Sequence, residues 1–383
     1  MVPIVVDLYC PFTIEHLEQT RGRSAAGDAA VNDEAAGFLG VLNAQIDQGD
    51  FFICASEAQR DFWIGGLHSR GRINPRTYAA DPTLRRLIDV VPFGLPDDDF
   101  DRTAAALPPV LKGVRPGIAA TDTVLLWGGS LLDWQDPVTL IEAVAALAPR
   151  RPELKLVFMG TKHPNPLVKP MRAVAASRER AEALGVLDRH VFFNDWVPYT
   201  ERARYLVEAD LGVSTHREHL ETHFAFRTRM LDYVWARLPI VCTDGDVFAR
   251  LVRSEGLGAA VPPGDAAALA QAIDRLLADD AARAAARAAL GRLGRELHWS
   301  RVVAPLARFL EAPASAADHA VGLARIRADL RGGYRVSKWL KRTALRMGVT
   351  ERRVEQLKRL GLVRALVVVR NRVALARAMR RAR

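Results

Sequence analysis

The sequence predicts an α/β fold with two parallel-sheet domains and a basic helical tail. The chain has 383 residues, which is longer than a single hydrophobic core usually accommodates. Short apolar runs alternate with stretches of helical period, as expected for doubly wound parallel sheets. Lys and Arg are concentrated after residue 320. We therefore expect domains at 1–113 and 114–300, and a crossover helix followed by a tail at 301–383.

The first domain is predicted from three strands and the helices between them. Ile4–Tyr9 is a short apolar run typical of a buried parallel strand, and a helix is expected from Ala35 to Gln48. Phe51–Ala55 is the next strand, and the following Ser56 can cap a helix. Ile88–Pro92 is the third strand. The acid-, Pro- and Gly-rich residues 97–118 then indicate a linker.

The second domain repeats the alternation of strand and helix more regularly. Because its strands are short and almost entirely apolar, we expect them to be buried on both faces. The predicted strands are Val124–Trp127, Leu154–Met159, His190–Phe193, Leu211–Ser214 and Ile240–Thr243. The two closing helices are predicted at Ala266–Ala278 and Asp280–Leu297.

Composition and cysteine spacing argue against a disulfide-bonded, membrane-spanning or secreted protein. Hydrophobic residues make up 49% and charged residues 26% of the chain, as in an ordinary globular protein. The three cysteines have no metal or disulfide spacing, no apolar run is long enough to span a bilayer, and no signal-peptide pattern is present. We therefore expect a cytoplasmic protein.

The net charge of +10 is distributed unevenly. Residues 321–383 hold nineteen Lys or Arg and three acids, so the rest of the chain is mildly acidic. In residues 334–383 the cations flank Leu and Val at near-helical spacing, which favours an amphipathic helix on an anionic membrane surface. The protein would then lie on the inner face of the plasma membrane. A helix packed on the body and nonspecific nucleic-acid binding are the alternatives, and we expect no specific nucleic acid.

Residues 226–232 predict an anion site at the start of a helix. Arg227 and Arg229 fall at the expected helix N-terminus, where free N–H groups and the helix dipole favour negative charge. Asp232 follows one turn later and can accept hydrogen bonds from hydroxyl groups. A nucleoside diphosphate presents both kinds of group. The alternative is that both arginines are solvated residues on the helix surface.

The stretch from Asp232 to Val241, DYVWARLPIV, resembles the donor half of retaining, family 4-type glycosyltransferases of the GT-B fold. In that family a Glu-x7-Glu motif opens this helix. Asp232 stands where the second Glu holds the ribose. Phe224 occupies the position of the first Glu, and Glu221 is the nearest acid. The resemblance extends over most of residues 120–290.

The resemblance implies transfer of a sugar from a UDP-, GDP- or dTDP-sugar, with retention of configuration and without a metal or other cofactor. The implied acceptor is a lipid-linked or cell-envelope glycan. GT-B enzymes have two Rossmann-like domains of comparable size, whereas the first domain here is short and opens directly on a strand. We therefore expect the N-terminal domain to be incomplete.

The resemblance also implies roles for residues at other strand ends. Gly128 and Gly129 follow the first strand of the second domain, where glycines let a backbone approach phosphate. The family's usual Arg and Lys beyond them are replaced by Ser130 and Gln135. We expect Arg227, Arg229 and Lys162 to supply the missing charge.

Two further loops contribute candidates. His163 lies beside Lys162, and either His163 or Glu221 is predicted to contact the donor sugar, while Trp196 or Val197 is predicted to flank the base. The predicted catalytic residues are therefore Glu221, His163 and Arg227, with no general base. The spacing of His216, His219 and His223 also permits a metal site, but the resemblance favours a metal-free donor site. A Pro-rich turn around His163 and a core role for Trp196 are the alternatives.

Other functions on the same fold stay open. A GT-B sugar-nucleotide epimerase or hydrolase would need acid and base groups from the first domain. A catalytically inactive protein that binds nucleotide sugar or acts as a scaffold would fit the replaced cations. A dinucleotide-dependent dehydrogenase is disfavoured, because no Gly-x-Gly-x-x-Gly follows a predicted strand.

Overall fold

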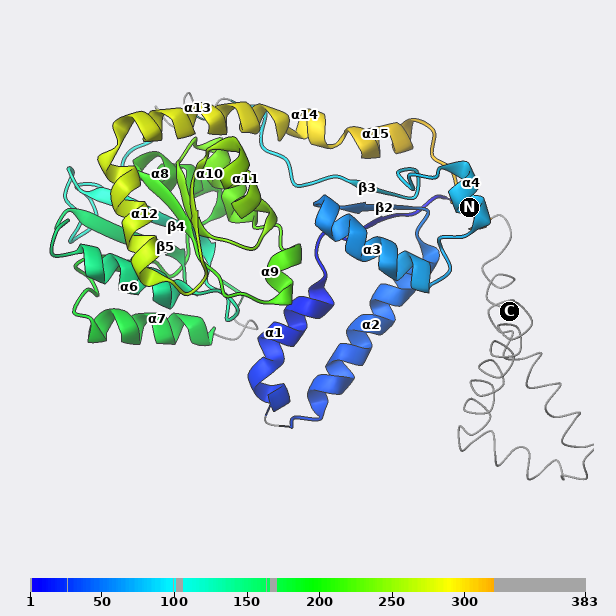
Figure 1. Cartoon of the computed structure of the whole chain (residues 1–383), viewed down its shortest axis with the longest axis horizontal. Helices are drawn as coiled ribbons and strands as arrows, with labels where there is room; N and C mark the ends of the chain where they lie inside the picture. The colour runs from blue at the N-terminus through cyan, green and yellow to red at the C-terminus, as the bar shows by residue number, and fades with distance from the viewer. Residues whose placement is uncertain are drawn as a thin grey trace, which may run out of the picture.

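The computed structural model describes residues 2–25, 27–98, 100, 106–162, 164–165 and 171–319. These residues form two parallel-sheet domains side by side, and the C-terminal helices run across both of them (Figure 1). The predicted α/β architecture is confirmed. The predicted tail helix at 334–383 lies outside the described residues. In the described ranges we find no helix with the length and apolar character needed to cross a membrane.

The first domain has a three-stranded sheet of order β1-β2-β3, with every pair parallel. Its core forms because alternate strand residues such as Val6, Phe52 and Ile88 pack against Trp63 and Leu67. Its elements are β1 (Val5–Asp7), α1 (Phe12–Ala25), α2 (Ala30–Gln48), β2 (Phe51–Cys54), α3 (Glu57–Ser69), α4 (Pro75–Ala80) and β3 (Ile88–Val90).

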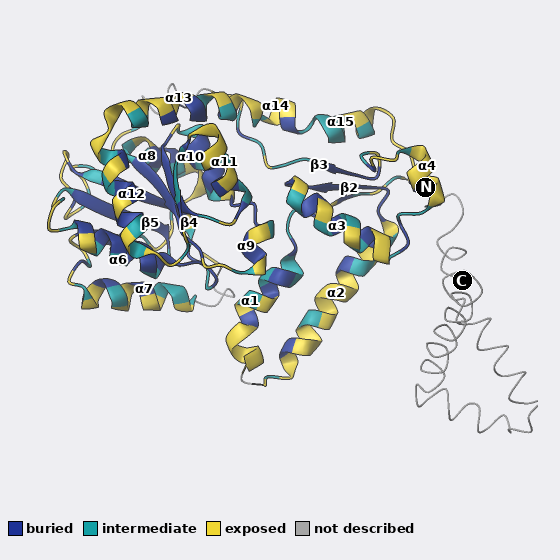
Figure 2. Ribbon diagram, viewed as in Figure 1, coloured by how far each residue is buried: buried dark blue, intermediate teal, exposed yellow. Residues whose placement is uncertain are grey.

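The cap of α3 is as predicted, whereas α2 is longer than predicted. The side chain of Ser56 caps α3 by accepting a hydrogen bond from the N–H of Gln59, as predicted. The helix predicted at 35–48 begins earlier, at Ala30, and the further helix α1 precedes it. Most of α2 is exposed (Figure 2).

The second domain has a six-stranded parallel sheet of order β6-β5-β4-β7-β8-β9. Most of the strands are buried (Figure 2), as their apolar sequences predict, whereas the edge strand β9 is largely half-buried. Its elements are β4 (Thr123–Ser130), α6 (Pro137–Leu147), β5 (Leu154–Gly160), α7 (Arg172–Ala183), β6 (Val191–Phe193), η1 (Tyr199–Glu201), α8 (Arg202–Glu208), β7 (Leu211–Ser214), α9 (Leu220–Phe224), α10 (Thr228–Trp235), β8 (Ile240–Thr243), α11 (Val247–Glu255), β9 (Gly258–Val261), α12 (Ala266–Ala278) and α13 (Asp280–Glu296).

The strand order of this sheet indicates where a ligand would bind. From β4 the chain first adds β5 and β6 on one side, and then returns to place β7, β8 and β9 on the other. In open parallel sheets a ligand binds beyond the carboxyl ends of the strands at this reversal. The ends of β4 and β7, at Ser130 and Ser214, are therefore where a ligand is expected.

After α13 the chain returns to the first domain through α14 (Trp299–Val302) and α15 (Ala304–Glu311) (Figure 1). Phe309 stacks on Phe51, with ring centroids 4.8 Å apart. The Nε of Arg72 donates to a carboxylate oxygen of Asp318 at 2.6 Å, and both side chains are fully buried. The crossover segment is therefore fixed to the first domain by both apolar and ionic contacts.

Candidate functional site

Tyr233 holds α10 against the ends of β4 and β7. Its hydroxyl accepts a hydrogen bond from the N–H of Gly128 at 2.8 Å and lies 2.9 Å from the carbonyl oxygens of Leu126 and Val213. Gly212 leaves room for the ring, because a Cβ there would lie 2.5 Å from it. The N-terminus of α10 is thereby held at the strand reversal.

The two predicted glycines differ in their surroundings. Gly128 is buried, and a Cβ there would lie 3.3 Å from the ring of Tyr233. Gly129 is exposed, has a φ of +82°, and would place a Cβ in open space. Glycine is thus required at 129 for its backbone conformation. The backbone at Gly129 is the part of this turn that a ligand can approach.

Arg229 reaches back from α10 to the end of β4. Its Nη2 donates to the carbonyl oxygen of Ser130 at 3.0 Å, and its guanidinium lies 4.3 Å from the ring centre of Trp127. Its Nη1 is buried and has no hydrogen-bond partner among the described residues. Burial lowers the pKa of Arg229 to about 10, because the charged form has lost water. A bound anion would relieve this cost.

Arg227 is held by another predicted residue, Glu221. The two Nη atoms of Arg227 donate to the two carboxylate oxygens of Glu221 at 2.9 and 2.7 Å, and both side chains are buried. The Nε of Arg227 lies 3.7 Å from Asp246. The structure therefore brings Glu221 and Arg227 together as an ion pair, so in this conformation the charge of Arg227 is already balanced.

Asp232 faces α8, where it pairs with Arg202. The Nε of Arg202 donates to the carboxylate at 3.0 Å, and its guanidinium lies 3.5 Å from the ring centre of Tyr199. Burial raises the pKa of Asp232, although the charge and hydrogen bond of Arg202 oppose this. The Asp232 side chain is 30% exposed, so it is still accessible to a hydroxyl donor. Sequence reasoning missed Arg202.

The loops after β5 and β6 are joined by backbone hydrogen bonds. The N–H groups of Thr161 and Lys162 both donate to the carbonyl oxygen of Asp195, at 2.9 and 2.8 Å. Of the two residues predicted to flank a base, Val197 packs against the core whereas Trp196 is 41% exposed. Trp196 is therefore the one whose ring a ligand can reach. His163 lies outside the described residues.

The first domain contacts the segment between α9 and α10. Gln59 donates to the carbonyl oxygen of Phe224 at 2.8 Å, and the rings of Phe62 and Phe224 lie 4.9 Å apart. The hydroxyl of Tyr9 donates to the carbonyl oxygen of Phe226 at 3.0 Å. Phe224 stands where the resembled family has its first Glu. In this protein it therefore takes part in the contact between the two domains.

Glu15, in the first turn of α1, also belongs to this junction, and the sequence analysis did not identify it. Helix α1 packs against α9 (Figure 1). Burial raises the pKa of Glu15, and the negative charge of Glu221 raises it further, while Arg227 lowers it. An acid of the first domain thus lies within electrostatic range of the Glu221–Arg227 pair.

The histidines of this region are involved in separate local contacts. The Nε2 of His219 lies 2.9 Å from the carbonyl oxygen of Trp134, and that of His216 lies 3.4 Å from Asp246. His223 is exposed. Within the described ranges no cluster of three or more His, Cys, Asp or Glu has a geometry that could hold a metal ion.

Comparison with known proteins relates the second domain to one family. Residues 122–279 match the family model described as "Glycosyl transferases group 1". The second domain is therefore similar to a group 1 glycosyltransferase domain. The match covers all six strands of the second sheet, including the β4–β7 reversal.

Individual relatives agree with this assignment. A phosphatidyl-myo-inositol mannosyltransferase of Mycobacterium leprae is 35% identical over 91 residues, so the chain spans about a quarter (24%) of that curated relative. Anabaena HepE, solved with UDP-glucose, has a TM-score of 0.56 at 16% identity, over 81% of this chain and 72% of its own. A glycosyltransferase of Rickettsia africae has a TM-score of 0.50 at 16% identity, over 71% and 66%. The predicted GT-B architecture is therefore confirmed.

Proposed function

We propose that this protein transfers a sugar from a nucleotide diphosphate sugar to an acceptor. The observation that carries the proposal is the buried Nη1 of Arg229, which has no hydrogen-bond partner among the described residues. The same guanidinium bonds Ser130, which follows the exposed Gly129 at the strand reversal. A diphosphate would supply the missing acceptor atoms and the opposite charge. Anabaena HepE, which shares the fold, has been solved with UDP and with UDP-glucose.

The geometry supports a specific placement of the donor. The diphosphate would lie between the backbone of Gly129 and the start of α10, bound by Arg229. The ribose hydroxyls would donate to Asp232, which Arg202 holds in place. The base would lie against the exposed ring of Trp196. Lys162, exposed in the adjoining loop, would contribute charge from the opposite side.

The proposed chemistry rests on stabilising the departing diphosphate. Positive charge from the α10 N-terminus and from the buried guanidinium of Arg229 would act where water is partly excluded, which strengthens electrostatic stabilisation. We propose that no metal is required, since these groups supply the needed charge. We also propose retention of configuration, as the resemblance to retaining GT-B enzymes implies. The Glu221–Arg227 pair would border the sugar, with Glu221 oriented by its two hydrogen bonds. His163 is proposed as the other sugar contact.

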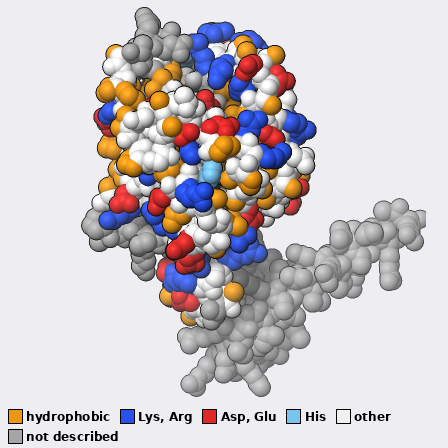
Figure 3. All heavy atoms as spheres, turned by 90° about the vertical axis from the view of Figure 1, so that its left-hand side faces the viewer, with side chains coloured by type: hydrophobic (Ala, Val, Ile, Leu, Met, Phe, Trp, Pro, Cys, Tyr) orange, Lys and Arg blue, Asp and Glu red, His pale blue; other side chains and the backbone are white. Residues whose placement is uncertain are grey.

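The proposed acceptor is a lipid-linked or cell-envelope glycan. The protein would act in the cytoplasm, with residues 334–383 holding it on the anionic inner face of the plasma membrane. On the face of the second domain in Figure 3, cationic and anionic side chains are interspersed. A continuous basic surface of the kind that binds a phosphate backbone is thus not a feature of that face.

The test is a donor screen on the full chain. UDP-, GDP- and dTDP-sugars are incubated with lipid-linked acceptors, with and without EDTA, and both nucleotide release and glycosylated product are measured. The binding of each donor is measured in parallel by calorimetry. We expect one donor class to give product at the same rate with EDTA. Failure of every nucleotide sugar to bind would overturn the proposal.

A second candidate is a protein that binds nucleotide sugar without turning it over. Phe224 favours it, because this residue replaces the family's first Glu and packs against Phe62. In the screen above, this candidate predicts donor binding by calorimetry with no nucleotide release under any condition. Acceptor-dependent release of nucleotide would exclude it.

A further inference from the structure

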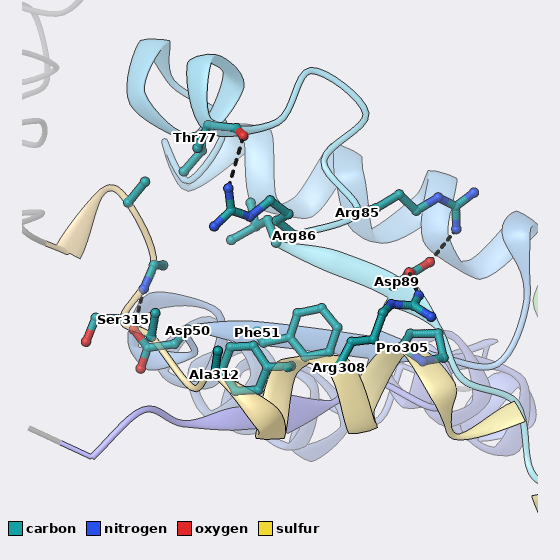
Figure 4. A pocket seen from close by; sticks show the side chains of 16 residues that line it. Asp50, Phe51, Thr77, Arg85, Arg86, Asp89, Pro305, Arg308, Ala312 and Ser315 are labelled. Carbon is teal, nitrogen blue, oxygen red and sulfur yellow. Dashed lines mark hydrogen bonds and ion pairs between the residues drawn. The ribbon is translucent and has the colours of Figure 1, made fainter. Parts of the chain in front are cut away.

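The first domain contains a cavity of about 440 Å³ at the end remote from the strand reversal, between α4 and α15. One wall is α4 with residues 85–89, and the other is α15 with residues 312–317 (Figure 4). This volume lies within the range of small-molecule sites in proteins. The cavity shares no residue with the candidate donor site.

The cavity exists because small residues follow α15, which is fixed to the first domain. Phe51 and Phe309 stack at 4.8 Å and close one side with an apolar surface. The next segment, residues 312–317, lines the cavity with alanines and one serine, which leave the space unfilled. The buried Arg72–Asp318 pair fixes that segment. The cavity is thus preformed.

The acids that line the cavity are already balanced. Asp50 accepts hydrogen bonds from the N–H groups of Ile4 and Ala316 at 2.8 Å and lies 2.7 Å from the Nδ1 of His319. One oxygen of Asp89 accepts from Arg85 at 2.6 Å. Neither carboxylate presents an uncompensated charge to the cavity.

Two of the arginines lining the cavity are held only weakly. The guanidinium of Arg308 approaches Asp89 at 3.9 Å, and that of Arg86 approaches the carbonyl oxygen of Ala80 at 3.5 Å. Both distances are at or beyond the limit of a hydrogen bond. Arg85, in contrast, is paired with both Asp89 and Glu57. Arg86 and Arg308, from opposite walls (Figure 4), are therefore available to a further anion.

We propose that this cavity is a second ligand site, for an anionic amphiphile such as a phosphate monoester that carries an apolar chain. The phosphate would lie between Arg86 and Arg308, and the chain over Phe51 and Phe309. Arginine suits the phosphate because its planar donors can bind two oxygens at once. The ligand is either a membrane lipid headgroup or a free phosphate ester, and this site is independent of the donor function.

The experiment is calorimetric titration of the full chain with hexyl phosphate, inorganic phosphate and 1-hexanol. We expect hexyl phosphate to bind at least tenfold more tightly than the other two probes. The double variant R86Q/R308Q should weaken its binding at least tenfold. The control Arg76→Gln, an exposed arginine of α4 outside the cavity, should change it less than twofold. UDP binding should be the same in all three proteins.

Vesicles distinguish the two sources. If less R86Q/R308Q than Arg76→Gln sediments with phosphatidic acid vesicles, the site binds a lipid headgroup. Because residues 334–383 are themselves proposed to bind the membrane, equal sedimentation is not sufficient alone. Equal sedimentation, together with hexyl phosphate binding to wild type that added phosphatidic acid vesicles do not weaken, would assign the site to a free phosphate ester. The proposal is overturned if hexyl phosphate does not bind, if it binds R86Q/R308Q as tightly as wild type, or if 1-hexanol binds equally well.

Discussion

Replacing Arg229 by Met should weaken ligand binding without a large change in the free energy of unfolding. The side chain now donates one hydrogen bond to the carbonyl oxygen of Ser130 and covers Trp127. Its Nη1 is buried and has no hydrogen-bond partner in the part of the chain that the structure describes. Met fills a similar space but cannot donate to an anion. We therefore expect the affinity for UDP to fall while the fold persists.

The magnitudes follow from these contacts. Losing a charged hydrogen bond to diphosphate costs about 1.5–3 kcal/mol, which is a tenfold to 150-fold loss of affinity. For stability, removal of an unsatisfied buried N–H group gains about 1–3 kcal/mol. Loss of the bond to Ser130 and of the cation–π contact with Trp127 costs a similar amount. The opposing terms should leave the free energy of unfolding within about 2 kcal/mol of wild type.

The assay pairs calorimetric UDP titration with urea unfolding. The control is Arg250→Met, which removes an exposed arginine of α11 and should leave both measurements unchanged. If Arg229→Met binds UDP with wild-type affinity, the diphosphate does not lie on Arg229, and the placement of the donor is wrong.

Three further predictions concern stability. Asp318→Asn leaves Arg72 buried without its charge partner, so the free energy of unfolding in urea should fall by about 3–5 kcal/mol; a loss below 1 kcal/mol would contradict a buried pair. Gly212→Ala places a methyl group 2.5 Å from the Tyr233 ring and should cost about 1–3 kcal/mol and weaken UDP binding; unchanged UDP affinity would show that Tyr233 does not position α10. Burial raises the pKa of Glu15 above the 4.5 of a free carboxyl, so the folded state favours the protonated form and wild type loses stability as pH rises through the raised pKa. Glu15→Gln should therefore exceed wild type in melting temperature at pH 7 and match it below about pH 4.5, and parallel curves would refute the shift.

The sequence predicted the second domain well because its signals are local. Buried parallel strands such as Leu154–Met159 are continuous apolar runs, and a cation in the first turn of an expected helix, as at Arg229, is visible in one stretch of sequence. Helix α1 was missed because its polar sequence, FTIEHLEQTRGRSA, buries few apolar side chains and has a weak helical pattern.

The pairings within the site could not be predicted in this way. Glu221 and Arg227 meet across a break between two short helices, so no single helical periodicity relates them. Asp232 and Arg202 are thirty residues apart and meet only because α10 packs beside α8. Such contacts depend on tertiary packing, and they determine which of the predicted cations is available to a ligand.

The central claim is that a nucleoside diphosphate binds at the β4–β7 strand reversal. Hydrogen–deuterium exchange of the full chain with and without UDP tests it most directly, because amide protection maps the ligand onto the backbone. We predict slower exchange at Gly129 and Ser130, at Thr228 and Arg229, and in the loop around Trp196. Protection confined to residues 85–89 or 312–317, or none at saturating UDP, would contradict the account.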